Sequence, residues 1–314
     1  GVAGVHAAET IRQLDPNGKI TMISDEVFPP YCRPMISMVL EGSVPPEKLP
    51  IRPSSFYEEF KIEPVLGNRV SAVDVENRAV SVNGKVYPYD KLLIATGADP
   101  RRIKADGLEL KNIFFMRTET HVRQMLSTLP TIRKALVLGG GLVGFKASYG
   151  LLRRGIQVIM LIRSGYPLSM QVDSEAGCMI WDELKAHGLD VRLGVEATAF
   201  EGKDTVSRAH LSDGSFLPCD MVVIGKGVFP ARGFIPKEKI KVDAGIVVDE
   251  HMETSAPGVF AAGDVAECID IARKTPWVNA IWPEAVAQGR IAGMNMAGRR
   301  TAYKGSLSRN VIRI

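Results

Sequence analysis

Residues 135–144 read ALVLGGGLVG, a short apolar run that leads into a complete G-x-G-x-x-G motif formed by Gly139, Gly141 and Gly144. Glycines in this spacing permit a tight turn and let the backbone approach a pyrophosphate closely. The N-terminus of the helix that follows stabilises the negative charge. Because residues 145–154 have a helical pattern, the stretch predicts a strand, a phosphate-binding turn and a helix, as in a Rossmann-type unit.

An incomplete copy of this motif opens the chain. Gly1 and Gly4 fit its last two glycines, and a helical pattern over residues 6–14 follows, whereas the opening strand and the first glycine are missing. We therefore expect this sequence to be a piece of a longer chain. One such motif is weakly informative, but two of them, 140 residues apart, indicate a protein that brings two dinucleotides together.

The composition bounds the remaining possibilities. A chain of 314 residues with 46% hydrophobic content can bury a substantial core, usually in more than one domain. No run approaches the ~18 apolar residues of a membrane span, and no secretory signal is visible, so no membrane association is expected. The four cysteines are scattered without metal-ligand spacing, which favours a cytoplasmic protein without a metal site. The net charge of +4 is spread along the chain and favours a solvated surface over nucleic-acid binding, although it suits an acidic protein partner.

Strand-like and helix-like patterns alternate along the chain and predict an α/β fold with parallel, doubly wound sheets. A small antiparallel meander is expected between residues 70 and 86, turning at Asn83-Gly84. The other expected strands are residues 19–23, 92–95, 135–138, 157–162, 190–193 and 221–224, and the later helices are 175–187 and 283–297. Together with the two glycine motifs, this predicts two Rossmann-like dinucleotide-binding domains produced by internal duplication.

Charged residues follow both motifs at the spacing where an acid commonly binds the adenosine ribose. Asp25 lies 21 positions after Gly4, with Glu26 beside it, so one of them is expected to bind a ribose. The residue 19 positions after Gly144 is Arg163, which can pair with a 2′-phosphate and would favour NADP(H). An exposed arginine at a strand end is the alternative interpretation.

Near the end of the chain, an apolar run over residues 259–262 is followed by Gly263-Asp264. Parallel sheets bind ligands at the carboxyl ends of their strands, where a glycine admits the ligand and a carboxylate accepts a hydrogen bond from a hydroxyl. Asp264 is therefore a candidate for binding a sugar-like chain. The alternative is a simple Gly-Asp turn.

These features occur in a fixed order that resembles the FAD- and NAD(P)-dependent pyridine nucleotide-disulfide oxidoreductase family over almost the whole chain. Residues 31–37 (YCRPMIS) and 279–290 (NAIWPEAVAQGR) look closest to NADH:rubredoxin reductase and the flavin-binding part of NAD(P)H nitrite reductase. The resemblance implies that FAD is bound by Gly1, Gly4, Asp25, Glu26, Arg33, Pro34, Val70, Thr96, Gly97, Gly263, Asp264 and Trp282. It implies that NAD(P)H, the substrate, is bound by Gly139, Gly141, Val143, Gly144 and Gly227.

Three positions depart from the family pattern. Cys32 precedes Arg33 rather than standing at the position of the redox cysteine of related reductases, which aligns near Ser37. Lys146 stands where many relatives have a glutamate near the nicotinamide, and Met38 stands where some have a lysine near the flavin. Lys146 is either a compensating charge or a solvated helix residue.

The resemblance also implies the domain organisation and the reaction. We expect an FAD-binding domain over residues 1–107 and 229–300, an inserted NAD(P)-binding domain over 108–228, and at 301–314 the start of a truncated C-terminal domain that forms a homodimer interface. NAD(P)H would pass a hydride to the flavin, and electrons would continue to a small redox protein or a metal centre, with no catalytic side chain. The alternatives are a peroxide, oxygen or disulfide reductase that uses Cys32, and a non-catalytic flavin-binding subunit.

Overall fold

A computed structural model describes residues 1–309, which form two compact units. The first comprises residues 1–32, 50–99 and 230–309, and the second comprises residues 33–49 and 100–229. Two short strands, β7 (Ala98–Pro100) and β16 (Val228–Pro230), carry the chain from one unit to the other and back. Of the C-terminal segment expected at 301–314, residues 310–314 lie outside the described part of the chain.

The boundaries of these units differ from the expected ones for a physical reason. Residues 100–107 belong to the second unit because Asp106 pairs with strand β12 (Ala197–Glu201), its N–H donating to the Thr198 carbonyl at 3.3 Å. Residues 33–49 also belong to the second unit, because helix α2 (Ile36–Glu41) packs against helices α5 (Leu142–Arg153) and α4 (Glu119–Thr128).

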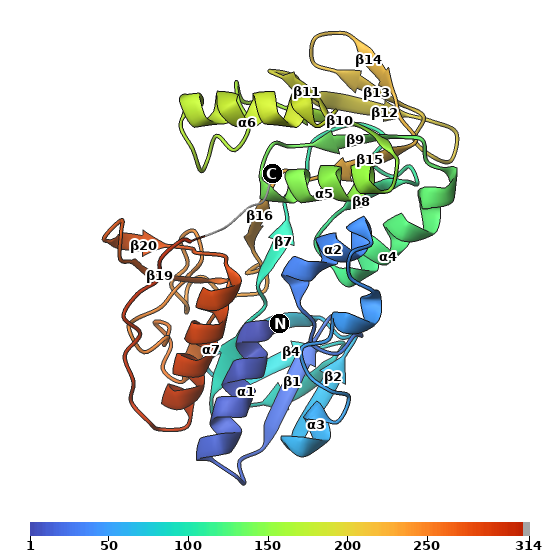
Figure 1. Ribbon diagram of the computed structural model, residues 1–314. Coiled ribbons are helices and arrows are strands. Elements are labelled where there is room, and N and C mark those ends of the chain that lie inside the picture. The colour runs from blue at the N-terminus through green and yellow to red at the C-terminus, as the bar shows by residue number, and fades with distance from the viewer. Residues whose placement is uncertain (310–314) are drawn as a thin grey trace. The chain divides into compact units, whose positions relative to one another are not determined.

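The second unit is built on a five-stranded parallel sheet (Figure 1). Its strands lie in the order β11 (Asp190–Leu193), β10 (Gln157–Ile162), β9 (Lys134–Leu138), β15 (Met221–Ile224) and β8 (Ile113–Phe115). From β9 the chain passes through α5 to β10 and through α6 (Ser174–Ala186) to β11. It later returns to β15 on the other side of β9, so the strand order reverses between β9 and β15. Such a switch point is where α/β sheets bind ligands.

A small antiparallel sheet of β12, β13 (Arg208–Leu211) and β14 (Phe216–Pro218) completes this unit, and its buried side chains share a hydrophobic core with β9, β10 and β15. All four residues of β15 are buried, as expected for a strand that is covered on both faces. Two 3₁₀ turns, η1 (Arg33–Met35) and η2 (Pro46–Lys48), flank α2, and a third, η3 (Leu129–Thr131), follows α4.

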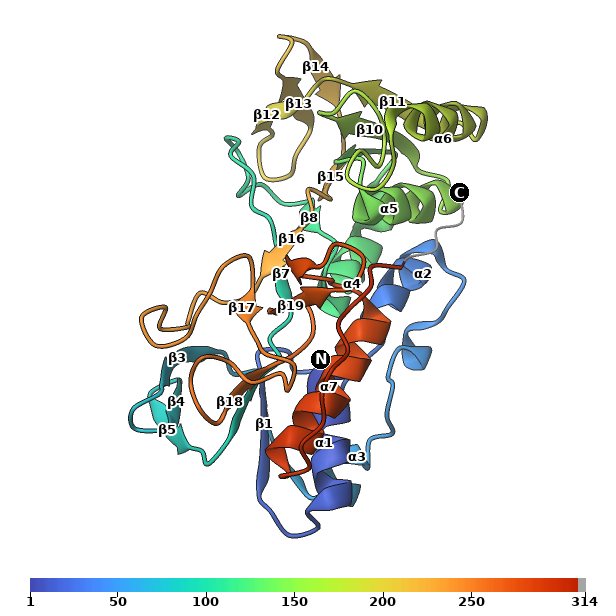
Figure 2. The same cartoon turned by 90° about the vertical axis from the view of Figure 1, so that its left-hand side faces the viewer.

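In the first unit, helices α1 (Val2–Leu14) and α7 (Trp282–Met296) lie side by side, as both Figures 1 and 2 show. Their close approach depends on glycine: a Cβ atom at Gly289 would lie 2.3 Å from the Ala3 carbonyl oxygen, and one at Gly293 would lie 2.7 Å from that of Ala7. The first residues of α1, Val2 and Ala3, pack into the main core of this unit together with strand β18 (Val259–Ala261).

Short strands and one short helix make up the rest of the first unit. Two parallel pairs are β1 (Ile20–Ser24) with β2 (Ile62–Leu66), and β6 (Leu92–Ile94) with β18. The expected meander is confirmed as β3 (Val70–Asp74), β4 (Ala79–Val82) and β5 (Lys85–Pro88), and Asn83 and Gly84 both have positive φ at its turn. The remaining elements are α3 (Phe56–Glu59), β17 (Ile246–Val247), β19 (Ala266–Asp270) and β20 (Thr275–Trp277).

The architecture is therefore α/β, with two Rossmann-like units, as the sequence predicted. Within residues 1–309, no helix combines the length and the apolar character that crossing a membrane requires.

Candidate functional site

The glycine-rich turn of the second unit joins β9 to α5 at the switch point of the sheet. Gly139 has φ +112°, and a Cβ atom there would lie 2.6 Å from the Gly225 carbonyl oxygen. A Cβ atom at Gly144 would lie 2.0 Å from the Gly139 carbonyl oxygen. These two glycines are therefore required for the tight packing of the turn against β15, whose following residue is Gly225.

Gly141 has a different role, because a Cβ atom there would meet nothing within 4 Å. It is the N-cap residue of α5, where no side chain caps the helix and the first turn contains no acidic residue. The first turn, which includes the half-buried Val143, thus presents backbone N–H groups beside an open space. This geometry fits the pyrophosphate of a dinucleotide.

Three charged side chains lie at the same edge of the sheet. The Nζ atom of Lys226 is 2.9 Å from Oε1 of Glu196, and Nε of Arg163 is 3.9 Å from the same oxygen. Arg163 follows β10, as predicted, and its side chain is 77% exposed. Gly227, which follows Lys226, has φ +88° and accepts a hydrogen bond from the Arg101 N–H at 2.9 Å.

In the first unit, two of the predicted motifs come together at one edge. Strands β6 and β18 are parallel, and Ile94 is in register with Ala261. The segments that follow them, Thr96-Gly97 and Gly263-Asp264, therefore leave the strands at the same end. The start of α1 joins them: a Cβ atom at Gly4 would lie 3.7 Å from that of Ala95, and one at Gly263 would lie 3.2 Å from that of Ala3.

This edge has the features of a second dinucleotide site. Gly1 is the N-cap of α1 and, like Gly141, has no side-chain cap and nothing within 4 Å of a Cβ position. Gly263 has φ +82°, which opens the turn that presents Asp264. The Thr96 hydroxyl donates to the Ala231 carbonyl at 2.8 Å and holds its own loop in place. The residues present fit the phosphates and the polyol chain of a flavin dinucleotide.

The predicted ribose-binding acids lie at the end of the parallel strand β1. The side chain of Glu26 accepts a hydrogen bond from the Tyr31 hydroxyl at 2.6 Å, and Asp25 lies 3.7 Å from a guanidinium nitrogen of Arg69. Val70 begins β3 directly after Arg69, and the Asn68 N–H donates to the Ser24 carbonyl at 2.9 Å. The loop that leads to Val70 is thus attached to the end of β1.

Arg33 and Pro34 are in η1, which belongs to the second compact unit, whereas the other predicted FAD residues belong to the first. There a guanidinium nitrogen of Arg33 donates to the Arg117 carbonyl at 2.8 Å. Trp282 is half-buried in the core of the first unit and opens α7, whose N-cap residue, Ile281, makes no side-chain cap. The first turn of α7 contains Glu284, which binds the hydroxyl of Tyr303.

One buried residue at this edge was not predicted. Gln288, in the middle of α7, is 1% exposed, and its Oε1 accepts the Gly263 N–H at 2.8 Å. Its Nε2 lies 3.5 Å from the sulfur of Cys268, which in turn lies 3.6 Å from the hydroxyl of the buried Ser306. The sequence signal for Gln288 was a glutamine beside the glycines of a predicted helix. Its partners Gly263 and Cys268 lie 20 or more positions away, so the sequence pattern could not identify them.

The positions that depart from the family pattern lie in or beside helices α2 and α5. Ser37 is buried and donates to the Pro34 carbonyl at 3.3 Å, whereas Met38 and Lys146 are exposed on their helices. Within residues 1–309, no cysteine forms a disulfide, and Cys32 is half-buried. Burial raises the pKa of the Cys219 thiol to about 12 and also raises the pKa of Cys268. Within residues 1–309, no three His, Cys, Asp or Glu side chains are grouped so that they could hold a metal ion.

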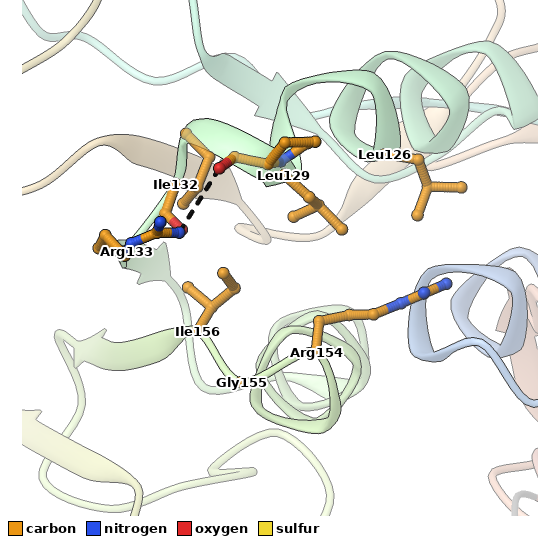
Figure 3. Close-up of a pocket in the computed structure, with 8 residues that line it drawn as sticks. Leu126, Leu129, Ile132, Arg133, Arg154, Gly155 and Ile156 are labelled. Carbon is orange, nitrogen blue, oxygen red and sulfur yellow. Dashed lines mark hydrogen bonds between the residues drawn. The ribbon is translucent and has the colours of Figure 1, made fainter.

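A pocket of about 370 Å³ in the second unit does not coincide with these sites (Figure 3). It is lined by Leu126, Leu129, Pro130, Ile132, Arg133, Arg154, Gly155 and Ile156. Residues 132–133 and 155–156 directly precede β9 and β10, so the pocket lies at the amino ends of these strands, opposite the glycine turn. Arg154 extends toward α2, where its Nε donates to the Leu40 carbonyl at 2.8 Å, so this side chain caps a helix.

Comparison with known proteins agrees with this geometry. Nitrite reductase [NAD(P)H] of Bacillus subtilis is 30% identical over 98% of this chain and 38% of its own length. Rubredoxin-NAD(+) reductase of Pseudomonas putida is 29% identical over 96% of this chain and 79% of its own length. Both resemblances inferred from the sequence are thereby confirmed, although the chain spans well under half of the nitrite reductase.

The solved structure of the ferredoxin reductase for the CYP199A2 system from Rhodopseudomonas palustris superimposes with a TM-score of 0.90 and 28% identity. The match covers 97% of this chain and 76% of that one. The profile of one family, described as pyridine nucleotide-disulphide oxidoreductase, matches residues 1–289. The chain therefore belongs to the pyridine nucleotide-disulphide oxidoreductase family.

Proposed function

We propose that this chain is the dinucleotide-binding part of an FAD-dependent oxidoreductase that takes electrons from NAD(P)H and passes them to a small redox protein. One observation carries the proposal: each compact unit presents an uncapped helix N-terminus, formed by glycine, at the carboxyl ends of its parallel strands. Proteins of this family use FAD, with NAD(P)H as substrate. Two such sites are what the reaction requires.

The first unit is the proposed FAD-binding domain. The backbone of Gly1 and Gly4 would bind the pyrophosphate, Asp25 or Glu26 would accept from the ribose, and Asp264 would accept from the ribityl chain. The carboxylates suit this role because hydroxyl groups donate to them. Arg33 and Pro34, in the second unit, remain proposed FAD contacts. When bound, FAD supplies a centre that accepts a hydride and releases electrons singly.

The second unit is the proposed NAD(P)H-binding domain. Gly139 and Gly144 shape the turn, Gly141 leaves room for the pyrophosphate, and the N–H groups of the first turn of α5 donate to it. Gly227 lines the same edge. These residues bind and orient the coenzyme, and no side chain of the chain is needed to move a proton.

We propose a small redox protein as the electron acceptor, because the rubredoxin and ferredoxin reductases among the relatives are named for such partners. A downstream metal centre is the second candidate. We propose a cytoplasmic location, which four cysteines outside disulfides support. We propose a homodimer of the full-length protein, which the resemblance described in the sequence analysis implies.

The proposal is tested by anaerobic stopped-flow reduction of the full-length, FAD-loaded protein. We expect rapid loss of flavin absorbance with NADH or NADPH. Bleaching by neither coenzyme would overturn the reductase function and favour a non-catalytic flavin-binding subunit. Comparison with a Lys146→Glu variant then shows whether the exposed lysine on α5 is responsible.

A further inference from the structure

Arg163, Glu196 and Lys226 form a charge triad at the edge of the proposed NAD(P)H site. They follow strands β10, β11 and β15, which are parallel members of one sheet, so all three leave it at the carboxyl edge. Both cations approach the same atom, Oε1 of Glu196. The three side chains together carry a net charge of +1.

The carboxylate is shared unequally. Lys226 is only 21% exposed and makes a hydrogen bond of 2.9 Å to Glu196, whereas Arg163 is 77% exposed and lies 3.9 Å away. At the longer distance and in contact with water, the Arg163 attraction is weaker and more strongly screened. The Glu196 backbone is also held, because its N–H donates to the Ser212 hydroxyl at 3.1 Å and its carbonyl accepts the Ser212 N–H at 2.8 Å. Glu196 therefore forms its stronger ion pair with Lys226 and its weaker one with Arg163.

The weak pairing of Arg163 with Glu196 bears on coenzyme binding, because Arg163 directly follows β10, the second strand of the Rossmann unit. At the end of the second strand of a Rossmann unit, an acid usually accepts from the ribose 2′-hydroxyl, whereas an arginine accommodates a 2′-phosphate. The planar guanidinium can donate two parallel hydrogen bonds to a phosphate. A free carboxylate within 4 Å would instead hold the guanidinium and repel the phosphate.

We propose that Lys226 is a specificity-determining residue, which holds and neutralises Glu196 so that Arg163 remains available to a 2′-phosphate and the site prefers NADPH to NADH. This inference rests on the proposed function, since it assigns the coenzyme of that same site. Lys226 acts through Glu196 and not by contact with the phosphate, so its effect must disappear when Glu196 loses its charge.

The test measures the binding of 2′,5′-ADP and 5′-AMP to the full-length flavoprotein by isothermal titration calorimetry at low ionic strength. These fragments differ only in the 2′-phosphate, and their binding is independent of flavin reduction. We expect the wild type to bind 2′,5′-ADP about tenfold more tightly than 5′-AMP, as one charge-assisted pair provides. Arg163→Ala should remove most of this ratio.

The decisive variants form a double-mutant cycle. Lys226→Met should lower the 2′,5′-ADP to 5′-AMP affinity ratio several-fold, Glu196→Gln should raise it, and the double variant should recover at least the wild-type ratio. Lys226→Arg, which keeps the ion pair, should also retain it. If Lys226→Met were poorly folded, Glu196→Gln alone would still test the proposal. A raised affinity ratio in that variant would support the role of Glu196, and a lowered ratio would contradict it.

The inference is overturned by a wild-type ratio near one, or by a Lys226→Met effect that persists with Glu196→Gln. Failure of the wild type to bind either fragment would overturn the nucleotide site itself, and with it the proposed function. Flavin bleaching that is equal with NADH and NADPH would leave the reductase function intact and refute only the coenzyme preference.

Discussion

The carboxamide of Gln288 and the backbone of Gly263 are hydrogen-bonded in the interior of the first unit, with 2.8 Å between Oε1 and N. This bond joins the middle of α7 to the turn that presents Asp264. Gly263 is itself in the left-handed region, and its N–H finds an acceptor in the side chain of Gln288. Gln288 is therefore a positioning residue for the proposed FAD site.

Replacing Gln288 with methionine keeps the volume but removes the acceptor. It leaves the Gly263 N–H buried without a partner, which costs about 1–3 kcal/mol. We expect FAD to dissociate roughly tenfold more readily, measured by the fluorescence of released flavin on dilution. Cys268→Ala is the matched control, because it removes a different partner of Gln288 and leaves the bond to Gly263. Equal FAD affinity in Gln288→Met and wild type would contradict the positioning role.

Substitution of Gly289 by alanine should force α1 and α7 apart. The new Cβ atom would lie 2.3 Å from the Ala3 carbonyl oxygen, which is main chain and cannot turn away. Overpacking of this kind costs about 1–3 kcal/mol, so we expect a lower midpoint of thermal unfolding. Gly233→Ala is the control, since its Cβ position is open. A variant at Gly289 as stable as the control would show that the helices adjust freely.

The stability of the protein should fall at alkaline pH because of Cys219. Burial raises the pKa of this thiol from 9.0 to about 12 in the folded protein, so the unfolded chain loses the proton first as the pH rises. The contribution of the protonated Cys219 thiol to the free energy of unfolding is complete below pH 9. It is lost between pH 9 and 12, by up to about 1.4 kcal/mol for each pH unit. Urea unfolding at pH 8 and pH 10.5 measures the loss. Cys219→Ala should reduce it, and an identical pH dependence in the variant would contradict the assignment.

A redox role for Cys32 is tested by its replacement with serine. We expect NAD(P)H-dependent reduction of an artificial acceptor such as ferricyanide to be retained, because the proposed electron path uses no thiol. Cys178→Ser, at an exposed position on α6, is the control for handling and oxidation. Loss of turnover confined to Cys32→Ser would favour a peroxide, oxygen or disulfide reductase.

Much of the fold followed from the sequence because the signals are local. The expected strands at 157–162, 190–193 and 221–224 became β10, β11 and β15 with the expected bounds. For β10 and β15 the signal is a nearly continuous apolar run, which a buried parallel strand needs. Asn83-Gly84 specified the meander turn, because few other residue pairs tolerate positive φ at both positions. The role of Gly144 could be predicted from the sequence, because its spacing in the glycine motif indicates a position where the backbone packs closely against the turn.

Only the tertiary structure decided how distant residues meet. Lys226 and Glu196 are 30 positions apart, and Gln288 and Gly263 are 25 apart, so neither pair leaves a periodic pattern in the sequence. The second compact unit includes Arg33 and Pro34 because α2 packs on α5, a contact between segments about 100 residues apart. The sequence by itself determined the main strands, the Asn83-Gly84 turn and the two dinucleotide motifs, because each depends on interactions within a few residues. Packing between distant segments determined that Lys226 pairs with Glu196 and that Gln288 holds the Gly263 turn, because these interactions form only when the chain is folded.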